Sequence, residues 1–193
     1  MDIIMISSNQ LLNILKEMLE ISQLMSGKST ITVTEFSVSV LLRELYEYYQ
    51  KQEEQKIKQY IAFDLDLSKM PVGKDFIITD REKLIHILKN LLNNAFKFTY
   101  GGKIVMGCMK ESPDSWHFYV RDTGIGIEKE KLELIFDTFR QGDESNTRQF
   151  GGVGLGLAVC REMMQLLGGR IWVESEMKKG SVFHLALPVK RDL

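Results

Sequence analysis

Cysteine, proline and histidine are scarce in this chain, which has two, three and three of them among 193 residues. Cys108 and Cys160 are too few and too far apart for the disulfide framework of a small secreted domain, so we expect two free, buried thiols. No apolar run reaches the roughly 18 residues of a membrane span, and the N-terminus lacks the pattern of a signal peptide. These absences predict a cytoplasmic protein, or the cytoplasmic part of a membrane-bound one, with no membrane span in this segment.

Neither sign of charge is in clear excess. The chain has 25 basic and 26 acidic residues, a formal net charge of −1, and therefore no basic field that would indicate a nucleic-acid partner. Hydrophobic residues make up 44% of the chain and charged residues 26%, which is enough apolar material for one well-filled core.

Hydrophobic periodicity divides the chain into helices and strands. Predicted helices cover residues 1–26, 38–56, 80–99, 128–136 and 155–167, and predicted strands cover 29–36, 60–67, 76–79, 103–110, 116–122, 170–176 and 181–189. The pattern predicts an α/β (α+β) two-layer sandwich, with a mixed, mostly antiparallel sheet and helices on one face. The first helix carries an apolar seam that needs a partner, formed by Leu11, Ile14, Met18, Ile21 and Met25.

The helix predicted over residues 80–99 has two distinct faces. Asp80 is its expected N-cap, and its apolar face consists of Leu84, Ile87, Leu88, Leu91, Leu92 and Ala95. Asn90, Asn94 and Lys97 recur at steps of four and three, so they share a second face. An amide oxygen can bind a metal ion and a lysine can bind phosphate, although a solvated polar face would show the same pattern.

A first glycine-rich segment, DTGIGI, follows a predicted strand directly. Asp122 at the end of that strand can accept a hydrogen bond from an exocyclic amine such as that of adenine. Gly124 and Gly126 permit backbone geometry that a Cβ would prevent, and a close approach to a flat ring. The alternative is an ordinary turn in which the aspartate caps the loop.

A second glycine-rich segment, GGVGLGL, stands directly before a predicted helix. Its backbone N–H groups and the positive end of the helix dipole would form an anion site that suits a polyphosphate, with Arg148 just upstream. No Gly-Lys-Ser/Thr follows, so the segment is not a P-loop, and it lacks the preceding strand of a dinucleotide fingerprint. A flexible hinge remains the alternative. Phe136 and Phe139, between the two segments, are either anchors of a mobile loop or core aromatics.

Taken in order, these motifs resemble the catalytic and ATP-binding domain of sensor histidine kinases, in the superfamily that also holds gyrase B, Hsp90 and MutL. The matching segments are NLLNNAFKFT for the asparagine box, DTGIGI and GGVGLGLA for the two glycine boxes, FDTFRQ for the phenylalanine box and GSVFHLALP for the closing strand. The resemblance runs from about residue 22 to the C-terminus and implies a Bergerat-type fold that binds ATP and Mg²⁺.

The resemblance also implies a role for individual residues. Asn94 would bind the Mg²⁺, Asp122 would bind the adenine amine, and Ser181 would help Asp122 through water. The catalytic set would be Asn90, Lys97 and Arg148, of which the last two contact phosphates, and residues 141–150 would form a lid. The whole nucleotide site would comprise Asn90, Asn94, Lys97, Asp122, Gly124, Gly126, Ile127, Phe136, Arg148, Gly152, Val153, Gly154, Leu155, Gly156 and Ser181.

Some positions depart from the family's pattern. Asn90 replaces the glutamate that activates water in gyrase-like members, and an amide is a poor general base, so hydrolysis should be slow. Val153 replaces a common threonine near the lid. His86, His117 and His184 are the chain's histidines, and none forms a His-Glu or His-Asp pair on an N-terminal helix.

We therefore expect residues 1–27 to be the second helix of a dimerisation hairpin, and residues 28–193 to be the catalytic domain. The expected partners are the histidine-bearing helix of a parent kinase, a response-regulator receiver domain, and a second copy of the chain through residues 4–25. We expect no self-phosphorylation. Two alternatives remain open: a gyrase-type hydrolytic ATPase, and a scaffold with a degenerate nucleotide site.

Overall fold

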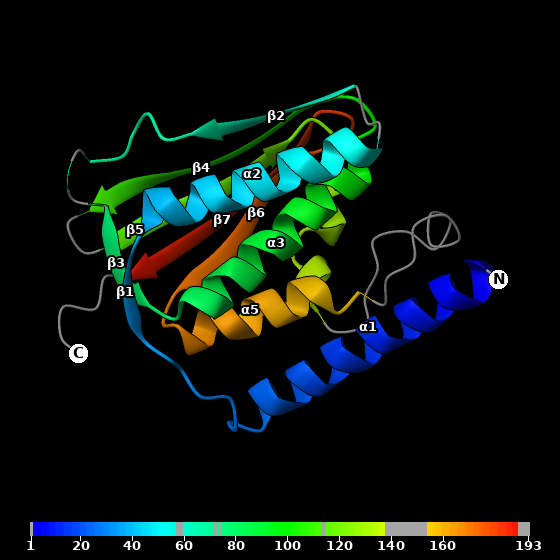
Figure 1. The fold of residues 1–193 in the computed structure, drawn as a ribbon, viewed down its shortest axis with the longest axis horizontal. Helices are drawn as coiled ribbons and strands as arrows, with labels where there is room; N and C mark the ends of the chain where they lie inside the picture. Colours follow the sequence, from blue (N-terminus) through cyan, green and yellow to red (C-terminus); the bar gives the residue numbers. More distant parts are fainter. Residues whose placement is uncertain are drawn as a thin grey trace.

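The computed structural model describes residues 2–56, 60–71, 73, 75–112, 115–137 and 154–188. It has two layers, a five-stranded sheet and a layer of helices over one face (Figure 1). The elements are α1 (Asp2–Met25), β1 (Thr34–Ser37), α2 (Val38–Lys56), β2 (Ile61–Asp66), β3 (Phe76–Thr79), α3 (Arg81–Phe98), β4 (Gly102–Ser112), β5 (Ser115–Asp122), α5 (Gly156–Leu166), β6 (Arg170–Glu176) and β7 (Gly180–Pro188). Among the described helices, none combines the length and apolar character needed to cross a bilayer.

The strand order of the main sheet is β2-β4-β5-β7-β6. β2 and β4 run parallel, while the β4–β5, β5–β7 and β6–β7 pairs are antiparallel. β1 and β3 form a separate two-stranded antiparallel sheet. The predicted fold class, a mixed and mostly antiparallel sheet with helices on one face, is confirmed.

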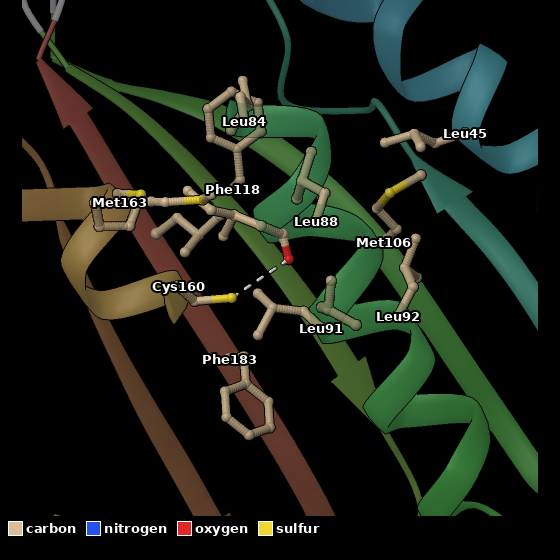
Figure 2. Close-up of a cluster of buried hydrophobic side chains, with 14 of the residues drawn as sticks. Leu45, Leu84, Leu88, Leu91, Leu92, Met106, Phe118, Cys160, Met163 and Phe183 are labelled. Atoms are coloured by element: carbon tan, nitrogen blue, oxygen red, sulfur yellow. Dashed lines mark hydrogen bonds between the residues drawn. The ribbon is translucent and has the colours of Figure 1, made fainter. Parts of the chain in front are cut away.

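α3 supplies the centre of the core. All six members of its predicted apolar face are at least 97% buried. Figure 2 shows Leu88 and Leu92 directed toward Met106 of β4, with Phe118 of β5 nearby. The two cysteines are free and buried, as predicted, and the Cys160 sulfur lies 4.0 Å from the backbone carbonyl oxygen of Ile87.

Asp80 caps the N-terminus of α3 and also holds the preceding segment against the helix. Its carboxylate accepts the Lys83 backbone N–H at 3.0 Å, which confirms the predicted N-cap, and the Thr32 backbone N–H at 2.9 Å. The strand predicted over residues 29–36 is therefore wrong at its start, since β1 begins at Thr34. Thr32 donates its N–H to this carboxylate, and β3, the partner strand, ends at Thr79.

We expect Asp80→Ala to lower the free energy of unfolding by about 2 kcal/mol, because two backbone N–H groups lose their acceptor. Burial opposes ionisation of Asp80, but hydrogen bonds from Lys83 and Thr32 outweigh it and hold the pKa below its usual value. The contribution should thus be complete above the unfolded-state pKa of about 3.9 and fade as pH falls toward the folded-state value. Urea titrations at several pH values measure this. Asp80→Asn, which retains a capping oxygen, should lose less; an equal loss would contradict the capping role.

The helix predicted over residues 128–136 is wrong: the chain makes two short 3-10 turns, Lys129–Lys131 and Leu134–Phe136. Only Phe136 within these turns is buried, so they lack the apolar face that would stabilise a regular helix. The helix predicted over residues 1–26 is confirmed as α1, which lies beside α5 (Figure 1). Ile21 of its predicted seam is buried within the chain's own core.

Candidate functional site

One face of α3 links the two glycine-rich segments. Asn90, Asn94 and Phe98 follow each other at steps of four residues, so they lie along the same side of the helix. The start of α5 meets this face at Asn90, and the loop over residues 122–127 meets it at Phe98. Asn94 lies one turn from each of these contacts. The structure thus brings the asparagine helix into contact with the first glycine segment and with Gly156, in the described part of the second one.

Asn90 packs against the first residue of α5. A Cβ added to Gly156 would lie 2.7 Å from both the nitrogen and the oxygen of the Asn90 amide, so any larger residue here would displace the Asn90 side chain. Gly154 adopts φ = +73°, and Leu155, the N-cap residue, makes no side-chain capping bond to the helix. Leu155 therefore does not cap the first N–H groups of α5, and N–H groups at a helix start are the kind that bind an anion.

The loop over residues 122–127 is held from two sides. The Ile125 N–H donates to the carbonyl oxygen of Phe98 at 3.2 Å, and the Ile125 carbonyl accepts the Lys178 N–H at 2.7 Å. A Cβ on Gly124 would overlap the Phe98 carbonyl, and a Cβ on Gly126, where φ is +71°, would overlap the Glu176 carbonyl. Glycine at both positions lets the loop fit between the end of α3 and the β6–β7 turn.

Asp122 is the buried carboxylate of this loop, with 7% of its surface exposed. Its Oδ1 accepts the Gly124 N–H at 2.8 Å. Burial raises the pKa of Asp122, an effect that the Gly124 and Ser181 backbone N–H groups partly offset. Two N–H donors do not exhaust the acceptor capacity of a carboxylate, so Asp122 can still accept a hydrogen bond from a ligand.

Ser181 of β7 is the register partner of Asp122 and is also buried. Its hydroxyl lies 2.9 Å from that of Ser175 on β6, a residue that the sequence analysis missed. Ser175 also accepts the Ile127 N–H at 2.8 Å, so it connects the first glycine segment to the closing strands. The sequence did contain a signal for Ser175. Counting the strand register outward from the short turn at 177–179 places Ser175 opposite Ser181.

The remaining predicted residues differ in how far the structure describes them. Phe136 is buried and makes an edge-on contact with Phe183, with ring centroids 6.5 Å apart, so it belongs to the core wall. Lys97 lies on α3 with its ammonium 5.0 Å from the centroid of the Phe98 ring. Other predictions lie outside the described residues, namely Phe139, Arg148, Gly152, Val153 and the lid over residues 141–150.

Comparisons with known proteins find histidine kinases among the relatives and structural neighbours of the chain. The chain is 38% identical over 198 residues to hybrid signal transduction histidine kinase L of Dictyostelium discoideum, which covers 100% of this chain and 11% of that protein. The crystal structure of full-length ShkA in complex with AMPPNP matches with a TM-score of 0.80 and 25% identity, over 97% of this chain and 38% of that one. The ThkA histidine kinase, solved in complex with the response regulator protein TrrA, matches with a TM-score of 0.75 and 27% identity, over 98% and 50%.

The chain spans about a tenth to a quarter of the length of its curated relatives, which include histidine kinases, a sensor kinase/phosphatase and a hybrid signal transduction protein. The model of one family matches residues 79–191, a range that contains α3, both glycine segments and the closing hairpin. This match covers more than half of the 193 residues. The chain belongs to the family of histidine kinase-, DNA gyrase B- and HSP90-like ATPases.

Proposed function

We propose that this chain is the ATP-binding catalytic part of a two-component sensor histidine kinase. It would transfer the γ-phosphoryl group of Mg-ATP to a histidine on a dimerisation helix outside this chain. The observation that carries the proposal is the face of α3 on which Asn90 meets the start of α5 and the Phe98 carbonyl meets the loop of Asp122. Such a face would offer one ligand both an anion site and a buried group that recognises the base.

Each end of the nucleotide would have its own residues. Asp122 would accept a hydrogen bond from the adenine amine, and the N–H groups at the start of α5 would bind phosphate. Lys97 and Arg148 would add positive charge near the phosphates. An amide oxygen suits Mg²⁺. Half-buried Asn94 lies one helical turn from Asn90 and one from Phe98, and it would hold the ion. The ion would neutralise phosphate charge when bound.

Catalysis would depend on positioning and charge stabilisation. A histidine nitrogen attacks the γ-phosphorus. The bond between this phosphorus and the β–γ bridging oxygen breaks at the same time, and ADP leaves with the electron pair. Asn90 contacts Gly156 at the phosphate end of the site, and its amide cannot act as an efficient base toward water. This favours transfer to a side chain over hydrolysis. His86 lies on α3, His117 on β5 and His184 on β7, none of them on a dimerisation helix.

Residues 1–27 would belong to the dimerisation hairpin and residues 28–193 to the catalytic domain. A homodimer through residues 4–25 is supported by the exposed leucines of α1, of which Leu11 is 59% and Leu19 63% exposed. The response-regulator complex of ThkA supports a receiver domain as a further partner. A parent kinase with these partners would keep this part of the chain in the cytoplasm.

The test supplies Mg-ATP and a separate helical hairpin that carries a histidine followed by an acidic residue. We expect an acid-labile phosphoryl label on the hairpin and none on the chain itself. Asn94→Ala should abolish labelling, while Asp64→Asn, on the edge strand β2, should leave it unchanged. Steady phosphate release without labelling would indicate a hydrolytic ATPase, and no saturable, Mg²⁺-dependent binding of an ATP analogue would indicate a scaffold.

A further inference from the structure

Three polar side chains lie on one rung of the sheet, at the end where the first glycine segment begins. Asp122 of β5 pairs with Ser181 of β7, and Ser181 pairs with Ser175 of β6. Register partners on neighbouring strands project to the same face of a sheet, so the carboxylate and the two hydroxyls form a row under the helical layer. The Ser175 and Ser181 oxygens are 2.9 Å apart.

The contacts of Ser175 fix the direction of its hydrogen bonds. Its hydroxyl lies 2.8 Å from the carbonyl oxygen of Gly180, and a carbonyl can only accept, so Ser175 must donate its single proton there. It also accepts the Ile127 N–H at 2.8 Å. In the contact between the two serines, Ser181 must therefore be the donor, and its proton binds to the second lone pair of the Ser175 oxygen.

We propose that Ser175 determines purine specificity by binding the hydroxyl proton of Ser181, so that Ser181 faces the nucleotide as an acceptor only. This inference rests on the proposed function. Asp122 and Ser181 then present acceptors, without a donor, on the same rung. An amino group at position 6 of a purine supplies the matching donor, directly or through a water molecule. A 6-oxo group would face acceptors alone and remain unpaired, so Ser175 acts through Ser181 as a positioning residue.

The experiment compares ATP with inosine triphosphate, which has a 6-oxo group and an N1 proton in place of the 6-amino group. Dissociation constants for both are measured with Mg²⁺ by calorimetry on the whole chain. Wild type should prefer ATP. Ser175→Ala frees the Ser181 proton to donate to the 6-oxo group, and the preference should fall by about tenfold. Ser175→Thr, which keeps a hydroxyl, should retain the preference.

A merely structural role gives a different result. If Ser175 only supported the loop at Ile127, the alanine variant would bind both nucleotides more weakly by the same factor, and an unchanged ratio would overturn the inference. Ser175→Cys, nearly isosteric and a weak acceptor, should shift the ratio in the same direction and serves if the alanine variant does not fold. A wild-type chain that binds neither nucleotide would instead refute the proposed function. Binding with an unchanged ratio refutes only the role of Ser175.

Discussion

Asp122→Asn should weaken ATP binding at least about a hundredfold, which is roughly 2.7 kcal/mol. The asparagine oxygen can still accept the Gly124 N–H, so the loop should keep its shape. Its NH2 group, however, would place a donor opposite the donor of the adenine amine, at a position where Asp122 is only 7% exposed. Calorimetric titration with a non-hydrolysable ATP analogue measures the loss, and an unchanged melting temperature establishes that the fold is intact.

The pH dependence of binding offers a second readout at the same residue. Burial raises the pKa of Asp122, so its carboxylate takes up a proton at a higher pH than an ordinary aspartate does. Because the ionised form accepts the amine, ATP affinity should fall as pH decreases through that raised pKa, and the Asn variant should lack this component. Asp64→Asn makes the same chemical change at an exposed ion pair with Lys103, and should leave affinity unchanged. Equal ATP affinity in wild type and Asp122→Asn would show that Asp122 is not part of the nucleotide site.

The parts of this site that the sequence revealed are those encoded by local spacing. The two faces of α3 follow from steps of three and four residues, and the Asp80 cap follows from its place before them. The requirement for glycine at positions 124 and 126 could also be predicted, because the two residues follow a strand end in a short loop. Such features depend on neighbours within a few residues, which is why they could be read without a structure.

Other features depended on partners distant in the sequence. Thr32 lies outside β1, although it was predicted to be part of a strand. Its N–H donates a hydrogen bond to the carboxylate of Asp80, 48 residues away. Ser175 gained its role from Ile127 and Ser181, which meet only when β5, β7 and β6 form one sheet. Residues 128–136 carried apolar residues that looked helical, yet Phe136 alone is buried within the two turns. Periodicity does not report which residues find a tertiary partner.

Gly180→Ala should lower the free energy of unfolding by about 3 kcal/mol or more, as measured by urea denaturation. Gly180 begins β7 with φ = +108°, a conformation that strains a residue with a Cβ. The added Cβ would also overlap the carbonyl oxygen of Asp122, and backbone at that point cannot move without shifting the β5–β7 ladder. ATP affinity should fall with stability, because the same shift displaces the Asp122 carboxylate.

Gly168→Ala is the matched control, since it isolates backbone conformation from the steric clash. Gly168 follows α5 with φ = +76°, and the nearest atom to an added Cβ would be a side-chain carbon of Pro188 at an ordinary 3.8 Å. That variant should cost about 1 kcal/mol and leave ATP affinity unchanged. If both variants lost the same amount, positive φ alone would account for Gly180. A larger loss at Gly180, accompanied by weaker ATP binding, would mean that the β6–β7 turn helps to position the carboxylate that reads the base.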